Sequence, residues 1–387
     1  MAELDQADPA PNLEPLAVTP TVDNATGPRR ADRRRAEAEF RPVVAVRMAG
    51  KPTALGAPGG GEVQMFALAQ ALRVMGLQAR PWRPWEDDLC EVDCLHLFGS
   101  LPEHLPVVEA ARRRGVPVVL STIAWFAPAC VWREPRPLIR RLAGCAALWA
   151  RARWTGLPSW RRRLYHAVDR LLPNSQAEAE QLVGYYGVPA ERIDVVPNGT
   201  EPRFARGDAE PFARLVGGRG FVLCPGRIEP RKNQLGLIRA MRGAGVPMVV
   251  LGDAVPGHAS YGAACRRAAD RNVRFVPALR HDDPLLASAY AACGCLALAS
   301  WFETPGLVAL EAAASGVPLV LPRGGCAAEY FGDLAEYVRP HDGAGIRRAV
   351  LAALRRRRDP RLAEHVLANF TWDAAARATC QAYDKVL

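Results

Sequence analysis

Short apolar runs alternate with amphipathic stretches along most of the chain, and this alternation predicts parallel βαβ units. In the first half, the apolar run that starts at Pro42 leads through the glycine-rich residues 56–62 into a stretch of helical periodicity. The same order begins again at Phe221. Both halves therefore fit the α/β class, each as a doubly wound domain.

The apolar runs predict eight strands and the amphipathic stretches predict the helices between them. The strands cover residues 42–48, 93–99, 116–122, 193–200, 221–226, 247–252, 273–277 and 295–299. The helices cover residues 63–75, 105–114, 175–185, 234–243, a segment ending at 290, 306–315 and 366–387. Ser175 and Glu178 have the S-x-x-E spacing of a capping box, which favours a helix start there.

Composition marks the limits of the two halves. Residues 1–41 are rich in Pro, Ala, Asp and Glu and end in a cluster of arginines, as is typical of a disordered tail. Residues 201–219 are polar and rich in Gly, Pro and Arg, which predicts an interdomain linker. We therefore expect ordered domains at 42–200 and 220–370 and a last helical segment at 371–387.

The balance of residues is that of a globular protein with a basic surface. Of the 387 residues, 49% are hydrophobic and 23% are charged, which excludes a globally disordered chain. The net charge of +10 admits nucleic acid, an anionic membrane or a phosphorylated substrate as partner, and no nucleic-acid motif accompanies it. Only three of the 50 basic residues are lysines, which singles out Lys232.

The ten cysteines are scattered without a C-x-x-C pair, so we expect no structural zinc. Most lie among apolar residues, which favours a reducing compartment. The amino terminus lacks an apolar leader, and the longest nearly apolar run, residues 287–302, is too short to cross a bilayer. We therefore expect a cytoplasmic protein.

Two glutamates, Glu303 and Glu311, flank the predicted start of a helix. The free amides of Gly306, Leu307 and Val308 at that start, together with the helix dipole, favour a bound phosphate. Glu311 lies about 7 Å further along the helix, which suits a carboxylate that accepts hydrogen bonds from ribose hydroxyls. Its neighbours are apolar, and a buried acid in a cleft is a candidate functional group.

A second motif, Gly226-Arg-Ile-Glu-Pro-Arg-Lys-Asn-Gln, follows the first strand of the second half. Ligands of open α/β sheets bind at the carboxyl ends of the strands, which is where Arg227 and Lys232 fall. Two cations at that place neutralise a diphosphate without a metal ion. The chain contains no D-x-D triplet, which also favours a metal-independent site.

These motifs resemble those of the large retaining glycosyltransferase family 4, which has the GT-B fold. The resemblance covers about residues 170–345 and is carried by Val195-Val-Pro-Asn-Gly-Thr, Gly226-Arg-Ile-Glu-Pro-Arg-Lys-Asn, Glu303-x7-Glu311 and Glu329-Tyr-Phe-Gly-Asp. Gly59-Gly-Gly-Glu62 is similar to the family's amino-terminal glycine loop. The resemblance implies two Rossmann-like domains facing across a cleft, an acceptor domain first and a nucleotide-sugar domain second, with the last helix crossing back to the first.

The resemblance further implies transfer of a sugar from a nucleoside diphosphate donor with retention at the anomeric carbon. In this interpretation Glu303 lies beside the donor sugar, and Arg227 and Lys232 bind the diphosphate and stabilise the departing charge. Glu311 holds the ribose. The backbone contacts to the donor come from Gly60, Gly61, Gly306, Leu307 and Val308. No metal and no cofactor other than the donor are implied.

One position departs from the family pattern. Members often have a histidine after the strand equivalent to Val118–Leu120, and this chain has Ser121-Thr122 there. The catalytic base is therefore unassigned, unless a diphosphate oxygen itself takes the acceptor proton. His96 and Trp125 are the candidate acceptor contacts, although a lone histidine beside a sheet is more often structural.

Tryptophan and arginine gather in residues 125–163. Such a face suits an anionic membrane or a lipid-linked acceptor, and a solvated helical surface is the alternative. The leading hypothesis is a cytoplasmic glycosyltransferase, peripheral on the inner face of the plasma membrane, that acts on a glycan or lipid-linked acceptor in surface polysaccharide or glycolipid synthesis. A GT-B nucleotide-sugar epimerase and a non-catalytic accessory protein that binds a sugar nucleotide are the alternatives.

Overall fold

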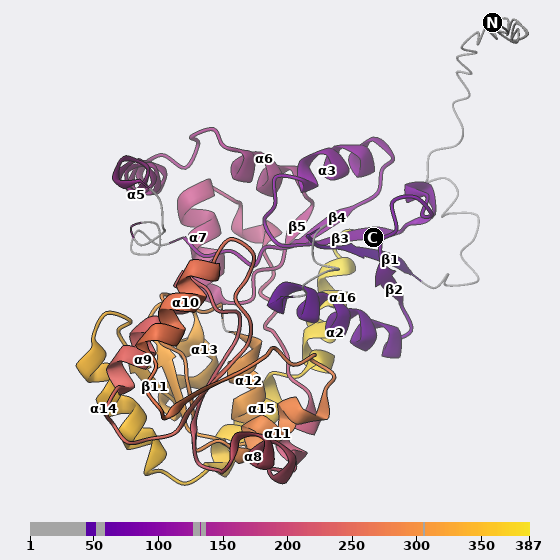
Figure 1. The fold of residues 1–387 in the computed structure, drawn as a ribbon. Coiled ribbons are helices and arrows are strands. Elements are labelled where there is room, and N and C mark those ends of the chain that lie inside the picture. The colour runs from indigo at the N-terminus through magenta and orange to yellow at the C-terminus, as the bar shows by residue number, and fades with distance from the viewer. Residues whose placement is uncertain (1–43, 52–58, 127–131, 133–136, 305) are drawn as a thin grey trace, which may run out of the picture. The chain divides into compact units, whose positions relative to one another are not determined.

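The structure of the chain, a computed structural model, describes residues 44–51, 59–126, 132, 137–304 and 306–387. These residues form two separate parallel sheets, each flanked by helices (Figure 1). The tail predicted at 1–41 and the first part of the glycine-rich segment 56–62 lie outside the described residues.

The first sheet has five parallel strands in the order β2-β1-β3-β4-β5. They are β1 (Ala45–Ala49), β2 (Gln78–Pro81), β3 (Cys94–Phe98), β4 (Val118–Ser121) and β5 (Arg170–Leu171). Every residue of β3 and β4 is buried, as expected for the central strands of a parallel sheet covered on both faces. The strand order reverses between β1 and β3, so the loops after these two strands flank the switch point of the sheet.

The helices of this half alternate with its strands. They are α2 (Gly60–Val74), α3 (His104–Arg113), α5 (Leu138–Arg153), α6 (Trp160–Ala167) and α7 (Gln176–Tyr186), with 3-10 turns at Leu89–Glu91 and Ala190–Arg192. Helix α2 shares one apolar cluster with α16 (Trp372–Tyr383) through Met65, Leu72, Ala376 and Tyr383. The last helix of the chain therefore packs on the first sheet's side of the molecule.

The second sheet has six parallel strands in the order β11-β10-β9-β6-β7-β8. They are β6 (Val222–Pro225), β7 (Met248–Leu251), β8 (Val273–Val276), β9 (Cys295–Ala297), β10 (Leu319–Pro322) and β11 (Glu336–Val338). Its helices are α8 (Glu210–Val216), α9 (Gln234–Met241), α10 (Ala259–Ala268), α11 (Pro284–Ala292), α12 (Leu307–Ala314), α13 (Ala327–Phe331), α14 (Gly343–Leu354) and α15 (Pro360–Asn369). Read from β8, the order is the 3-2-1-4-5-6 of a Rossmann fold. The predicted α/β class with two doubly wound domains is confirmed.

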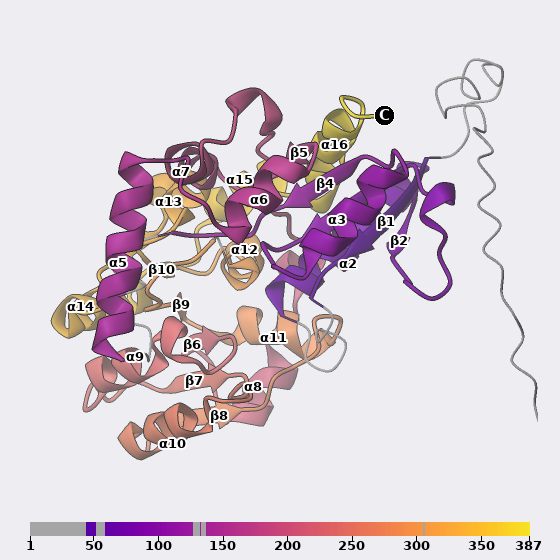
Figure 2. The same ribbon diagram turned by 90° about the horizontal axis from the view of Figure 1, so that it is seen from above.

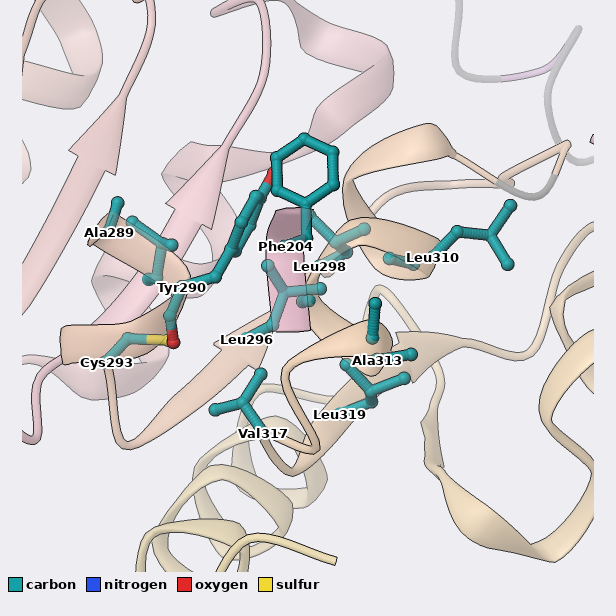
Figure 3. Packing of buried hydrophobic residues seen from close by; sticks show 14 of the residues in the cluster. Phe204, Ala289, Tyr290, Cys293, Leu296, Leu298, Leu310, Ala313, Val317 and Leu319 are labelled. Carbon is teal, nitrogen blue, oxygen red and sulfur yellow. The ribbon is translucent and has the colours of Figure 1, made fainter. Parts of the chain in front are cut away.

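A dense apolar cluster packs on the second sheet (Figure 3). Leu296 and Leu298 contribute from β9 and the residues after it, Tyr290 contributes from α11 and Leu310 from α12, and all are almost fully buried. Phe204 closes the cluster, with its ring centroid 5.6 Å from that of Tyr290 in an edge-to-face contact. Each Å² of buried apolar surface stabilises the fold by about 25 cal/mol, and the burial of these side chains holds α11 and α12 against the sheet.

Phe204 changes the interpretation of the predicted linker at 201–219. This segment contains a 3-10 turn at Pro202–Arg206 and helix α8, and it buries both Phe204 and Phe212 in the cluster of the second sheet. The burial of these two aromatic side chains holds the segment on the second sheet, although the neighbouring residues are mostly polar. Most of this segment therefore packs as part of the second half.

Other predicted elements differ in their limits. Residues 193–200 form no strand and make only isolated bridges, one to β5 and one to Thr371. The helix predicted at 366–387 is interrupted at Phe370, because the hydroxyl of Thr371 accepts a hydrogen bond from the Ala374 amide and starts α16 anew. Gly199 fits against this break, where a Cβ would lie 2.3 Å from the Trp372 nitrogen.

Candidate functional site

The two motifs of the second half meet at the switch point of the second sheet. Strands β6 and β9 are neighbours, and Val222 is paired with Cys295. The loop after β6 carries the Gly226 motif, and the loop after β9 carries Glu303. Because both strands are parallel, the two loops leave the same edge of the sheet, where ligands of this fold bind.

The loop after β6 is shaped by residues in the left-handed region of backbone conformation. Gly226 has φ 124°, and Asn233 has φ 52°. The Asn233 side chain donates to the Ala299 carbonyl (2.9 Å) and the Pro340 carbonyl (2.8 Å), which ties this loop to the loop after β9. Lys232 directly precedes Asn233, so these hydrogen bonds also hold Lys232 at the carboxyl ends of the strands.

The loop that carries Glu303 is supported by the loop after the neighbouring strand, β10. The Glu303 amide donates to the Gly324 carbonyl (3.1 Å), and the Cys326 amide donates to the Glu303 carbonyl (3.0 Å). Gly325 has φ 102°, and a Cβ there would lie 1.9 Å from the Glu303 carbonyl oxygen. The Gly324-Gly325 pair is therefore required for this support, and its place one residue after the apolar run 319–322 was the sequence signal that could have identified it.

Lys232 and Glu303 form a buried ion pair. The Lys232 ammonium lies 2.7 Å from one carboxylate oxygen of Glu303 and 2.9 Å from the other. Ser300 donates its hydroxyl to the same carboxylate (2.5 Å), and a nitrogen of the Arg231 guanidinium lies 4.0 Å away. The motifs placed Lys232 and Glu303 in one site, but they indicate neither that the two side chains neutralise each other nor that Ser300 and Arg231 lie beside them.

The pKa values of the pair follow from burial and from the neighbouring charges. Burial opposes ionisation of Glu303, but the charges of Lys232 and Arg231 outweigh it and lower the pKa of the carboxyl group below its usual range. Burial also lowers the pKa of Lys232, and the Glu303 carboxylate opposes that change. Glu303 is thus held as a carboxylate at neutral pH.

Arg227 is the more accessible cation of the site. Half of its side chain is exposed, and the nearest carboxylate, that of Glu229, is 3.9 Å away. A Cβ added to Gly59 would lie 3.0 Å from a guanidinium nitrogen of Arg227, so the start of α2 approaches the loop after β6. Arg227 therefore lies close to elements of both halves.

Gly60 and Gly61 lie in the first turn of α2, whereas the sequence placed them in a loop. The Gly59 amide at the N-cap donates to the carboxylate of Glu62 (2.7 Å). The amides of Gly60 and Gly61 stand at a helix start, a position that suits an anion. Their contact with a donor diphosphate remains a prediction.

The start of α12 has a similar geometry. Gly306 is its N-cap with φ 26°, and a Cβ there would lie 2.9 Å from a carboxylate oxygen of Glu303. Leu307 and Val308 form the first turn, so their amides belong to the unpaired group at the helix start. The structure thus brings Gly306, Glu303 and Lys232 together.

Glu311 lies on α12 with almost no exposed surface. Its carboxylate accepts a hydrogen bond from the Tyr290 hydroxyl (2.6 Å) and lies 3.1 Å from Nε2 of His281. Burial, followed by the charge of Glu311, raises the pKa of Tyr290 well above its usual value. Neither Tyr290 nor His281 had been identified from the sequence, because Tyr290 lies 21 residues away on α11 and His281 lies 30 residues away in the loop before it.

The structure corrects the assignment of His96 as a contact for the acceptor. Its side chain is fully buried in β3, with Nδ1 2.7 Å from the Tyr383 hydroxyl and Nε2 2.9 Å from the Ser121 hydroxyl. Burial lowers its pKa to about 3. His96 therefore joins β3 to β4 and to α16 as a neutral side chain and has no surface to offer a substrate.

The segment without the family's histidine is held by a buried glutamate. The Glu178 carboxylate accepts hydrogen bonds from the Thr122 hydroxyl (2.5 Å) and from the amides of Ala124 (2.6 Å) and Asn174 (3.0 Å). The predicted capping box is therefore only half formed: Ser175 accepts from the Glu178 amide, but the Glu178 side chain turns elsewhere. Burial raises the pKa of Glu178 to about 7.

Trp125, the other candidate acceptor contact, is partly buried and packs against the apolar cluster of the second sheet. It thus connects the segment after β4 with the second half. Its contact with an acceptor remains a prediction.

Several further contacts join the two halves. The Glu329 carboxylate accepts hydrogen bonds from the amides of Gln176 (2.7 Å) and Ala177 (2.8 Å) at the start of α7. The Tyr330 hydroxyl donates to the Asn174 carbonyl and accepts from the Asn198 amide (3.0 Å). The Glu329-Tyr-Phe-Gly-Asp element thus fixes one half to the other through backbone groups. Within the described ranges, no three His, Cys, Asp or Glu side chains are arranged to hold a metal ion.

Two family models match the chain in succession. The model of Glycosyltransferase Family 4 matches residues 78–204, and the model of Glycosyl transferases group 1 matches residues 219–356. A D-inositol 3-phosphate glycosyltransferase from Nocardia farcinica is 32% identical over 249 residues, which cover 58% of this chain and 54% of that relative. The chain spans little more than half the length of the curated relatives it matches.

Two solved structures are similar in fold. Sucrose-phosphate synthase from Thermosynechococcus elongatus is 17% identical, with a TM-score of 0.66 over 89% of this chain and 99% of that chain. The HepE protein of Anabaena, in complex with UDP and glucose, is 18% identical, with a TM-score of 0.62 over 88% of this chain and 98% of that chain. At this level of identity the likeness concerns the fold.

Proposed function

Because the chain belongs to glycosyltransferase family 4 and has the GT-B fold, we propose that it transfers a sugar from a nucleoside diphosphate sugar to a glycan or lipid-linked acceptor with retention at the anomeric carbon. The observation that carries this proposal is the buried Lys232–Glu303 ion pair beside the accessible Arg227, at the switch point of the second sheet. A charged pair is costly to bury, and one at a ligand-binding edge is a candidate functional group.

The cations have a clear electrostatic part in such a reaction. Negative charge develops on the diphosphate as the bond to the sugar breaks, and preorganised positive groups stabilise it. Arg227 can turn toward the diphosphate because half of its side chain is in solvent. Lys232 is held in place by Glu303, so little reorganisation is needed when a second anion arrives. We therefore expect turnover without an added metal ion.

Glu303 and the start of α12 supply the remaining groups. The carboxylate is kept ionised by its cations and lies against Gly306, so it can face the positive charge that develops on the sugar. The amides at the start of α12 can bind the phosphate or the sugar hydroxyls. Glu311 can accept hydrogen bonds from the ribose while it keeps its contacts with His281 and Tyr290, because a carboxylate has about four acceptor sites and these contacts use one on each oxygen.

The first experiment is a thermal-shift screen of the full chain against UDP, GDP, ADP, TDP and their common sugar conjugates. A ligand that binds only the folded state raises the melting temperature by mass action. We expect a shift with one nucleotide, lost in Glu311→Ala and kept in Glu364→Ala, an exposed control on α15. The absence of a shift with every nucleotide would overturn the donor site and favour an accessory role.

The second experiment measures turnover of the donor identified by that screen. Glu303→Gln should lower kcat by roughly a hundredfold or more while the affinity for the nucleotide changes little, because the variant loses charge near the reacting sugar. The acceptor screen includes lipid-linked glycans and D-inositol 3-phosphate, which the relatives' names contain. Unchanged turnover in Glu303→Gln would overturn the catalytic assignment, and an isomerised donor sugar without transfer would identify an epimerase.

The proposed place of action is the cytoplasmic face of a membrane, in the synthesis of a surface polysaccharide or glycolipid. Each helix in the described residues is too short or too polar to cross a bilayer. Association with the membrane would therefore depend on a surface of the protein.

A further inference from the structure

Helix α5 (Leu138–Arg153) is the most weakly packed long helix of the first half. It lies at the edge of the ribbon in both views and contacts α7 (Figures 1 and 2). Of its sixteen residues only Leu148 is buried. A helix of this length has little stability in water by itself, because most helices are stabilised by packing. With only one buried residue, α5 would gain stability from a partner that covers its exposed faces.

The face of α5 that points away from the protein is apolar. Leu138, Leu142 and Trp149 are 53%, 51% and 68% exposed, and Ile139 is 76% exposed. At about 100° per residue these side chains, with Ala146 between them, lie within a sector of about 100°. The usual arrangement is therefore inverted, since the apolar stripe of a surface helix normally faces the core.

Exposed large apolar side chains are concentrated around this helix. The described residues have twelve of them, and six belong to the segment 132–154. Trp149 and Trp154 lie against each other with ring centroids 6.2 Å apart, although both are more than half exposed. A contiguous apolar patch of this kind marks an interaction surface, whereas single exposed apolar residues do not.

The charged residues of α5 and of the stretch that follows it all have one sign. Between Pro137 and Arg163 the sequence contains seven arginines and no acidic residue. Arg141, Arg151 and Arg162 donate to backbone carbonyls, those of Trp132, Leu157 and Thr155. Among the described residues, Glu109 is the one carboxylate that pairs with any of the seven, at 3.5 Å from Arg163. The positive charge of the surface is therefore largely uncompensated.

We propose that α5 binds the surface of an anionic lipid bilayer and lies in its interface plane. The helix is too short to span a bilayer, but its apolar stripe can enter the boundary between headgroups and acyl chains. Tryptophan side chains such as those of Trp149 and Trp154 favour this depth. The exposed guanidinium groups of Arg140 and Arg153 lie at its ends and attract lipid phosphates.

The charge of the surface favours a bilayer over a second copy of the chain. A twofold interface through α5 would bring the same arginine-rich face of each copy against the other. Like charges opposed across such an interface repel, and the sequence between Pro137 and Arg163 contains no acidic residue to offset them. An anionic bilayer complements both the apolar stripe and the charge.

The proposal is tested by cosedimentation of the full chain with vesicles of phosphatidylcholine alone or mixed with phosphatidylglycerol. We expect binding to the anionic vesicles, which Ile139→Ser/Trp149→Ser and Arg140→Glu/Arg153→Glu each weaken by about tenfold or more. Trp85→Ser and Arg357→Glu are the matched controls, because both side chains are exposed on other surfaces. All four variants change exposed residues, so the fold should be retained.

Equal binding of the wild type and both α5 variants would overturn the proposal, as would failure of the wild type to bind anionic vesicles. Self-association that Trp149→Ser abolishes, without vesicle binding, would assign the patch to a second copy instead. The proposal deepens the proposed function by placing the enzyme at a lipid surface, but vesicle binding is measured without a sugar donor. Failure of transfer and failure of membrane binding are therefore separate results.

Discussion

Glu303 and Glu178 are both buried glutamates next to the end of a parallel strand, but their partners differ. Glu303, in the loop after β9, faces the ammonium of Lys232 and the guanidinium of Arg231. Glu178, in the first turn of α7, faces only uncharged donors, the hydroxyl of Thr122 and two backbone amides. Each carboxylate accepts at least three hydrogen bonds, so the number of bonds does not distinguish them.

The difference shows that charge, more than hydrogen-bond count, decides the ionisation of a buried acid here. Burial raises the pKa of both groups, but at Glu303 the two cations reverse that effect. At Glu178 the three donors oppose burial without cancelling it, and the pKa rises to about 7. Glu303, the acid of the proposed donor site, is thus ionised at neutral pH, whereas Glu178, which lies behind the segment Ser121–Phe126, can change its protonation near neutral pH.

Removing the cation of the first pair should give the largest effect. In Lys232→Met, Glu303 is left buried beside only the more distant Arg231. We expect the free energy of unfolding to fall by roughly 3–5 kcal/mol, as in other proteins in which one member of a buried ion pair is removed. Urea denaturation monitored by circular dichroism would measure this loss.

The double variant Lys232→Met/Glu303→Gln provides the control. Because it removes both charges, most of the stability should return while turnover remains lost, which separates the structural from the catalytic part of the pair. If Lys232→Met alone is as stable as the wild type, the Lys232–Glu303 pair does not stabilise Glu303 in the way the geometry indicates.

Glu178 should make stability depend on pH. The group titrates near 4.5 in the unfolded chain and at about 7 in the folded chain, so the folded state binds more protons between these values. The free energy of unfolding should therefore fall as pH rises from about 4.5 to 7, by up to about 3 kcal/mol, and this contribution should be constant at higher pH. Glu178→Gln, which cannot titrate, should lack this slope.

The comparison requires unfolding curves at several pH values for the wild type and for Glu178→Gln. Glu180→Gln is the matched control, since this glutamate lies two residues away on α7 and is exposed. The difference between the curves of wild type and Glu178→Gln isolates the one group. A difference that does not change with pH would show that Glu178 is ionised throughout.

Much of the fold could be predicted because most of the strands are short apolar runs and the loops between them carry glycine or polar residues. Strands β2, β5, β10 and β11 were not predicted, and β2 and β5 are short and contain arginine. The predictions failed where a local signal was outweighed or overlooked. Phe204 and Phe212 draw a polar segment into the core, and Thr371 restarts a helix whose apolar periodicity continues across the break. The hydroxyl at Thr371 was a capping signal that periodicity alone does not register.

The motifs of the sequence placed Lys232, Glu303 and Glu311 in one site, but neither their contacts nor their other partners could be predicted. Lys232 and Glu303 are 71 residues apart, and only the adjacency of β6 and β9 brings them into contact. His96 was misassigned although both of its neighbours in the sequence are leucines, a pattern typical of a strand buried on both faces. The partners of Glu311 and Glu178 come from other elements, and no spacing in the sequence indicates such contacts.

The smallest expected effect concerns Glu329, which lies close enough to Glu178 for its charge to raise the pKa of that group, as the weakest of the causes. Glu329→Gln removes the charge and one of the two acceptors at the start of α7, so the free energy of unfolding should fall by about 1 kcal/mol at pH values above 7. The loss should be largest at low pH, where Glu178 is protonated, and smaller at high pH, where the variant also relieves the repulsion between two carboxylates. Unfolding curves at one pH below 7, where Glu178 is protonated, and at one pH above 7, where it is ionised, measure the difference. Glu364→Gln is the exposed control. An equal loss at both ends would mean that Glu329 and Glu178 are electrostatically independent, and that burial alone raises the pKa of Glu178.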